Sequence, residues 1–71
     1  MNGVDVYLQD GPLRGAVRTA PVGPDGRPVE RVEFDHRADG GLFYVEYQRA
    51  EQGEDGWYYR ATGIEQRADE E

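Results

Sequence analysis

"LFYVEYQR", residues 42–49, is the stretch that decides the fold of this 71-residue chain. Every second residue in it is apolar or aromatic, which places Phe43, Val45 and Tyr47 on one face of a β-strand. The stretch "WYYRAT", residues 57–62, alternates in the same way. Together the two stretches predict an antiparallel hairpin.

Shorter alternating stretches precede this hairpin: "VDVYL" at residues 4–8, "AVRT" at 16–19 and "VERVEFD" at 29–35. Turns rich in glycine and proline separate them, and the polar run "AEQGEDG" is expected to close the last hairpin as a loop. No stretch has helical periodicity. We therefore expect an all-β fold, a small antiparallel meander of about five strands that forms a partly closed barrel or a two-layer sandwich.

The domain organisation follows from the same pattern. Residues 1–63 are expected to form a single small β domain, because a chain of this length supports one core. Residues 64–71, "IEQRADEE", contain good helix formers but are too few for a stable isolated helix. We expect them to form an acidic C-terminal tail.

Composition excludes several classes of function. The chain has 15 acidic residues against 8 arginines, a formal net charge of -7, and no lysine, serine or cysteine. Nucleophiles of those three types are therefore absent, and the acidic surface should repel nucleic acid and anionic membranes. The first ten residues do not resemble a signal peptide, and no apolar run approaches the roughly 20 residues of a membrane span. We expect a soluble cytoplasmic protein.

The aromatic residues are assigned by face. Inward positions of the expected strands hold Phe34, Phe43, Trp57 and Tyr59, which we predict to be core. Tyr44 and Tyr58 fall on the opposite face, beside Tyr7 and Arg60. Stacking of nucleic-acid bases on such tyrosines is disfavoured, because acids outnumber bases in this chain.

A protein-contact patch is the functional interpretation of that face, since tyrosine and arginine are enriched at interface hot spots. The alternative is that these are ordinary surface tyrosines. The candidate protein-binding residues are Tyr44, Tyr58, Arg60, Glu51, Glu54 and Asp55.

A metal or catalytic site has little support. Asp35, His36 and Asp39 lie close in sequence, but His36 is the only histidine, and a catalytic zinc usually takes three protein ligands. No phosphate-binding loop or EF-hand spacing is present. We predict no enzyme activity, no catalytic residue, no metal and no cofactor.

The excess of acids suggests a second function, imitation of the phosphate array of DNA. A small acidic domain of this kind would inhibit a host DNA-binding or defence enzyme by occupying its basic groove. The arginines interleaved with the acids weaken this alternative.

One resemblance concerns both ends of the chain. "VYLQDGPLRG" and "YQRAEQGEDGWYYRATG" resemble the first and last strands of small uncharacterised proteins of actinobacterial phages and prophages, which start with L-x-G-G-P-x-x-G and end with an aromatic G-W-x-Y strand. The matching residues are Leu8, Gly11, Pro12, Gly15, Tyr47, Arg49, Gly56, Trp57 and Tyr59. Asp10 replaces the first glycine of the opening motif. The resemblance implies a bacteriophage setting and no particular activity. An arginine-only cation set is also typical of GC-rich actinobacterial genomes.

These observations lead to one functional expectation. The chain is expected to be a non-enzymatic protein-binding module, a phage- or prophage-encoded accessory or virion-associated protein. Its partner would be another protein, with homo-oligomerisation as a further option, and no direct contact with nucleic acid or membrane. Its expected location is the host cytoplasm or the virion.

Overall fold

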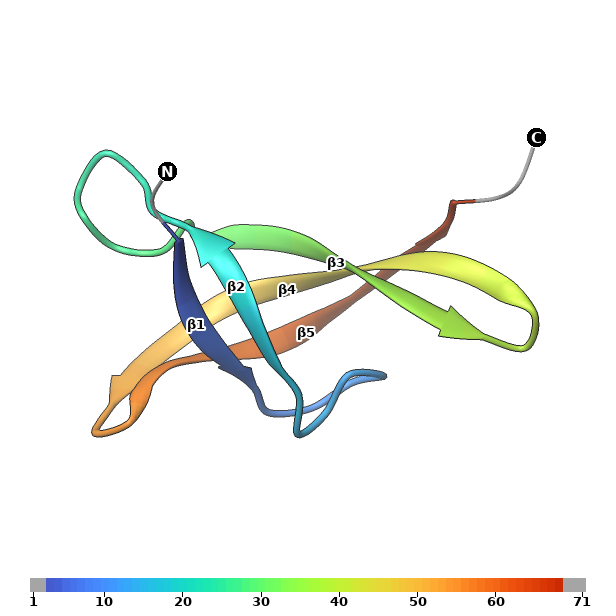
Figure 1. Ribbon diagram of the computed structural model, residues 1–71, viewed down its shortest axis with the longest axis horizontal. Helices are drawn as coiled ribbons and strands as arrows, with labels where there is room; N and C mark the ends of the chain where they lie inside the picture. Colours follow the sequence, from blue (N-terminus) through green and yellow to red (C-terminus); the bar gives the residue numbers. More distant parts are fainter. Residues whose placement is uncertain (1–2, 69–71) are drawn as a thin grey trace.

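The computed structural model describes residues 3–68, and these form five β-strands (Figure 1). The strands are β1 (Gly3–Leu8), β2 (Val17–Pro21), β3 (Arg31–Ala38), β4 (Gly41–Gly53) and β5 (Gly56–Arg67). The described residues hold no helix, so the all-β expectation is confirmed. It follows that they include no helix able to cross a membrane.

The strands make one sheet in the order β2-β1-β5-β4-β3, which curls into a nearly closed barrel (Figure 1). Consecutive strands pair as in a meander, except that β2 and β3 are the two edges of the sheet and do not pair with each other. Five strands that alternate in direction leave the first and the last running the same way. Accordingly β1 and β5 pair in parallel, whereas the other pairs are antiparallel. The expected meander of about five strands in a partly closed barrel is therefore confirmed, and the closing pair β1–β5 is parallel where the rest of the sheet is antiparallel.

The core fills the inside of the barrel. Its buried members come from every strand and from one loop: Val6, Leu8, Leu13, Ala20, Phe34, Val45, Tyr47 and Tyr59. Phe34 and Tyr59 are buried as expected, at 7% and 0% exposure. Trp57 and Phe43 are only half-buried, so their assignment to the core is corrected. Trp57 packs against the edge of the core, whereas Phe43 lies on β4 beyond the barrel, paired with His36 and Arg67.

Two loops close the ends of the barrel, and each is tied to a buried tyrosine. The Tyr47 hydroxyl donates a hydrogen bond to Asp10 O at 2.6 Å and accepts one from Leu13 N at 3.0 Å. The Tyr59 hydroxyl donates to Val29 O at 2.5 Å. The tyrosine rings therefore fill the core while their hydroxyls hold the loops in place.

The far part of the sheet projects from the barrel as a three-stranded arm, formed by residues 35–38, 41–45 and 62–68 (Figure 1). In the arm, Arg67 lies over the Phe43 ring at 5.8 Å. Residues 64–67 belong to β5, so the expected acidic tail at 64–71 is wrong for them. The register explains why, because these residues pair with β4 after the glycine bulge at Gly63, where φ is 94°. Residues 69–71 lie outside the described residues.

The β4–β5 hairpin is tighter than the sequence suggested. Its strands continue to Gly53 and restart at Gly56, so most of the expected loop at residues 50–56 is strand. Arg49 pairs with Tyr59 and Glu51 pairs with Tyr58, which leaves Ala50 as an extra residue in β4. This bulge reverses the faces beyond it, so that Arg49 points inward and Glu51 outward.

Candidate functional site

The outer surface of the barrel carries a row of apolar and aromatic side chains across three adjacent strands. Val17 of β2 pairs with Tyr7 of β1, and Tyr7 pairs with Tyr58 of β5. Directly paired residues share a face, so the register itself brings these side chains together. The two tyrosine rings have centroids 5.8 Å apart and are tilted by 47°. We refer to Val17, Tyr7 and Tyr58 as the tyrosine row.

Glycines lie beneath the tyrosine row and allow its rings to rest on bare backbone. A Cβ atom at Gly53 would collide with the Tyr58 ring, and one at Gly56 would lie 3.2 Å from Tyr7 Cε2. Aromatic side chains often cover strand glycines in this way. Both tyrosines are consequently half-buried, with one side of each ring against the sheet. Val17 is 46% exposed, because its register with Tyr7 turns it away from the core.

Carboxylates border the tyrosine row on one side. Glu51 is the β4 partner of Tyr58, and Glu54 and Asp55 form the tip of the same hairpin. All three side chains are exposed. Asp5 adds a fourth acid one step along β1, where it accepts a hydrogen bond from Thr19 Oγ1 at 3.3 Å. The result is an aromatic centre with an acidic margin.

The structure brings together only some of the residues expected to form the patch. Tyr58, Glu51, Glu54 and Asp55 lie together near the hairpin tip. Tyr44 lies on the arm, roughly 20 Å away along β4 at about 3.3 Å per residue. It is 40% exposed and pairs with Asp35 and Gln66.

Arg60 occupies the next outward position of β5 after Tyr58, so it lies beside the row as expected. Its Nε donates to Gln9 Oε1 at 3.2 Å, one step along β5 from Tyr58 on the outer face. Val17 is the row member that the sequence interpretation misses, because it reads as the leading apolar residue of its strand. Val17 and Ala20 are three residues apart, and strand residues separated by an odd number of positions point to opposite faces. This spacing is the signal that could have shown Val17 to face outward, because Ala20 faces the core.

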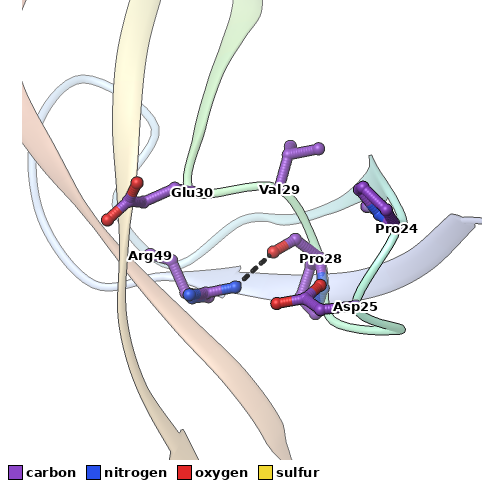
Figure 2. A pocket seen from close by; sticks show the side chains of 7 residues that line it. Pro24, Asp25, Pro28, Val29, Glu30 and Arg49 are labelled. Carbon is purple, nitrogen blue, oxygen red and sulfur yellow. Dashed lines mark hydrogen bonds between the residues drawn. The ribbon is translucent and has the colours of Figure 1, made fainter.

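A separate hollow of about 550 Å³ opens beside the loop between β2 and β3 (Figure 2). Its lining residues are Gly23, Pro24, Asp25, Pro28, Val29, Glu30 and Arg49. Arg49 Nη1 donates to Pro28 O at 2.7 Å, and the guanidinium lies 5.4 Å from the centre of the Trp57 ring. Asp25 Oδ1 accepts from Arg27 N at 3.0 Å and so holds the loop's own turn. Arg49 and Asp25 thus serve to fix this loop against the barrel.

Among residues 3–68, burial shifts the pKa values of Tyr47 and Tyr59. Burial in the core raises the pKa of Tyr47 above its usual range, and the backbone hydrogen bond from Leu13 opposes this in part. Burial likewise raises the pKa of Tyr59, with the positive charge of Arg49 opposing it. Both hydroxyls are engaged with the closing loops, so we assign them a structural role.

The acidic residues singled out as a metal candidate are not brought together. Asp35 and His36 are adjacent on β3 and therefore point to opposite faces, while Asp39 lies in the following turn with φ of 53°. Across residues 3–68, no three side chains of His, Cys, Asp or Glu are grouped in a way that could hold a metal ion.

The outer face of β3 carries charges of both signs. Arg31, Glu33, Asp35 and Arg37 follow one another there at every second position. Glu33 pairs directly with Glu46 of β4, and Thr62 Oγ1 donates to Glu46 Oε1 at 2.8 Å. This face therefore carries no continuous row of acids.

Comparison with known proteins gives one match. Residues 4–63 match the family model described as a domain of unknown function, DUF8847. We found no match to the chain among curated proteins or among solved structures. The matched residues span β1 to the bulge of β5, so they contain the whole barrel and the tyrosine row.

Proposed function

The chain belongs to the DUF8847 family, and we propose that it is a protein-binding module whose contact surface is centred on the tyrosine row. The observation that carries this proposal is the packing of Tyr7 against Tyr58 over strand glycines, beside an exposed Val17. Rigid aromatic side chains lose little conformational entropy when a partner covers them. Their half-buried rings are already held in place before binding.

The acidic margin defines the chemistry of the partner. Glu51, Glu54 and Asp55 would face the rim of the interface, where charges influence association rate and selectivity more than affinity. The partner surface should therefore have an apolar centre with arginine or lysine beside it. We propose binding without catalysis, in keeping with a chain that has no serine, cysteine or lysine nucleophile.

The biological setting is part of the proposal. The resemblance of both ends of the chain to actinobacterial phage and prophage proteins supports an accessory or virion-associated role in the host cytoplasm or the virion. Mimicry of DNA is less well supported, because arginines flank the two acids on the outer face of β3 and interrupt the negative charge there. A DNA mimic needs a continuous negative array.

The test is capture of partners from a lysate of a candidate host, with single variants of the bait. Tyr58→Ala should reduce capture of a specific protein at least about tenfold, as loss of an aromatic hot spot does. Tyr44→Ala removes an equally large exposed tyrosine from the remote arm, and it should leave that capture unchanged. Thermal unfolding of each bait confirms that it is folded.

A salt series separates the two candidate functions. Binding through the tyrosine row should change little with salt, whereas a DNA mimic should lose its partner steeply as salt rises and be displaced by DNA. Glu54→Arg should slow association without abolishing it. Capture that is indifferent to Tyr58→Ala and Tyr7→Ala would contradict the proposed surface.

A further inference from the structure

The arm ends in an open strand edge. Within residues 3–68, β3 pairs with β4 and with no other strand, and it stands at one end of the sheet order. The part of β3 in the arm, residues 35–38, projects beyond the barrel (Figure 1), and within residues 3–68 it has backbone hydrogen bonds to β4 alone. Strand edges of this kind accept a further strand through backbone hydrogen bonds.

The hydrogen-bond pattern identifies which residues offer their backbone to that edge. Asp39 and Gly40 both have positive φ, 53° and 74°, so they form a two-residue hairpin turn whose flanking pair is Ala38 and Gly41. In such a hairpin the flanking pair exchanges hydrogen bonds, and alternate pairs do so along the ladder. Asp35 and Arg37 therefore point their N–H and C=O groups away from β4.

A second contact agrees with this assignment. Ala68 N donates to Leu42 O at 2.7 Å, which shows that the Leu42 carbonyl points toward β5 and away from β3. Arg37, the β3 partner of Leu42, consequently has no hydrogen-bonding partner in that pair. Asp35 lies two residues away on the same strand and shares this orientation.

We propose that the occupant of this edge is a second copy of the chain, joined as an antiparallel β3–β3 pair across a two-fold axis at His36. In this register Asp35 of each copy faces Arg37 of the other, and both residues present free backbone groups to the seam. The seam thus combines paired backbone hydrogen bonds with two ion pairs on the outer face. One interface patch that is complementary to itself is what a two-fold dimer requires.

The charge sequence of β3 selects this register against its neighbours. Moving the two-fold axis from His36 to Asp35 brings Asp35 opposite Asp35 of the second copy. Moving the axis to Arg37 brings Arg37 opposite Arg37. A larger shift faces Arg31 with Arg37 and Glu33 with Asp35. Like charges directly opposite each other destabilise a strand pair. Among the registers that place Asp35 and Arg37 of the arm opposite charged residues of β3, only the one at His36 is free of them within the strand.

The shape of the molecule is compatible with this dimer. β3 runs from the barrel toward the end of the arm, so an antiparallel partner places its own barrel at the opposite end (Figure 1). The two arms would then form one six-stranded sheet with a barrel at each end. The tyrosine row lies on β2, β1 and β5, away from the seam, and stays accessible.

Charge reversal tests the proposal, with sedimentation velocity over a concentration series of the purified chain as the readout. The wild type should associate to a dimer as concentration rises. Asp35→Arg and Arg37→Asp should each weaken association at least about tenfold, because two attractive pairs become two repulsive ones. An equal mixture of the two variants should restore dimerisation, since each then faces its complement. Glu51→Arg makes the same charge change at the hairpin tip and should leave association unchanged.

Amide hydrogen exchange supplies an independent readout. The amides of Asp35 and Arg37 should become protected as the wild type is concentrated, and should exchange freely in Asp35→Arg at the same concentration. A wild type that stays monomeric at every concentration overturns the proposal. So does a dimer that Asp35→Arg leaves intact, or a mixture of the two folded variants that remains monomeric.

Discussion

At the scale of single residues, Tyr47 is the side chain on which most of the structure depends. It is fully buried, pairs with Ala61 across the β4–β5 hairpin, and packs 6.0 Å from the Phe34 ring. Its hydroxyl satisfies both Asp10 O and Leu13 N in the loop between β1 and β2. One phenol group therefore connects the centre of the core to the loop that closes it.

Removing only the Tyr47 hydroxyl should lower the stability of the fold. Tyr47→Phe leaves the ring in place but deprives the two backbone groups of their partner, which should lower the free energy of unfolding by about 1–3 kcal/mol. Urea denaturation measures the difference. Tyr44→Phe, the same change at an exposed position, should alter the free energy of unfolding by less than about 0.5 kcal/mol. Equal effects of the two substitutions would contradict the role assigned to the Tyr47 hydroxyl.

The raised pKa values of Tyr47 and Tyr59 predict alkaline instability. The native state holds these two protons more tightly than the unfolded chain, whose tyrosines ionise near pH 10. The resulting stability is complete below about pH 10 and is lost as pH rises through the native pKa values. Unfolding free energies measured between about pH 8 and 11.5 should fall above pH 10. The decline should be shallower in Tyr59→Phe, which has one such group fewer, and an unchanged slope would count against the burial argument.

At the scale of elements, the loop between β1 and β2 is fixed by close contact as well as by hydrogen bonds. Gly11 has φ of 77°, and a Cβ there would lie 2.7 Å from Ala61 Cβ and 2.8 Å from the Tyr47 hydroxyl. Gly15 has a similar φ of 85° but has open space where its Cβ would be. The two glycines thus separate the effect of backbone strain from that of crowding.

Alanine at these positions should give different losses of stability. Gly15→Ala should cost about 1 kcal/mol for placing a side chain in the left-handed region. Gly11→Ala carries the same strain and also pushes the loop off the barrel, so its cost should be greater by about 1–3 kcal/mol. Thermal unfolding of the two variants side by side measures this. Equal melting temperatures would show that the loop yields without cost.

At the scale of the whole molecule, the sequence predicted which face of a strand a residue occupies, but it did not predict the β-bulges or the strand register. Alternation alone predicted Phe34 and Tyr59 as core residues and placed Val45 on the face of Tyr47, and all four are buried. The bulge at Ala50 separates Arg49 from Glu51 by face, and no residue type marks that position in the sequence. Strand curvature and register arise from packing across the barrel, which a local pattern does not contain.

The candidate site follows the same division. Tyr58 and the acids of the hairpin tip were predictable, because they are close in sequence. Their grouping with Tyr7 and Val17 depends on the parallel β1–β5 pair, which joins opposite ends of the chain. Tyr44 was wrongly expected beside Tyr58, because two outward residues on neighbouring strands can still be far apart along them.

The parallel closure between the first and last strands also governs when the protein can fold during synthesis. Val6 pairs with Arg18 of β2 and with Trp57 of β5, so β1 is synthesised well before the second of its two partner strands. The hairpin of β1 and β2 can form early, but its inward side chains remain exposed to solvent until β5 pairs with β1. Such distant pairing slows folding, because the entropy of closing the chain is lost before the contacts form. We therefore expect the barrel to close only after β5 has been synthesised.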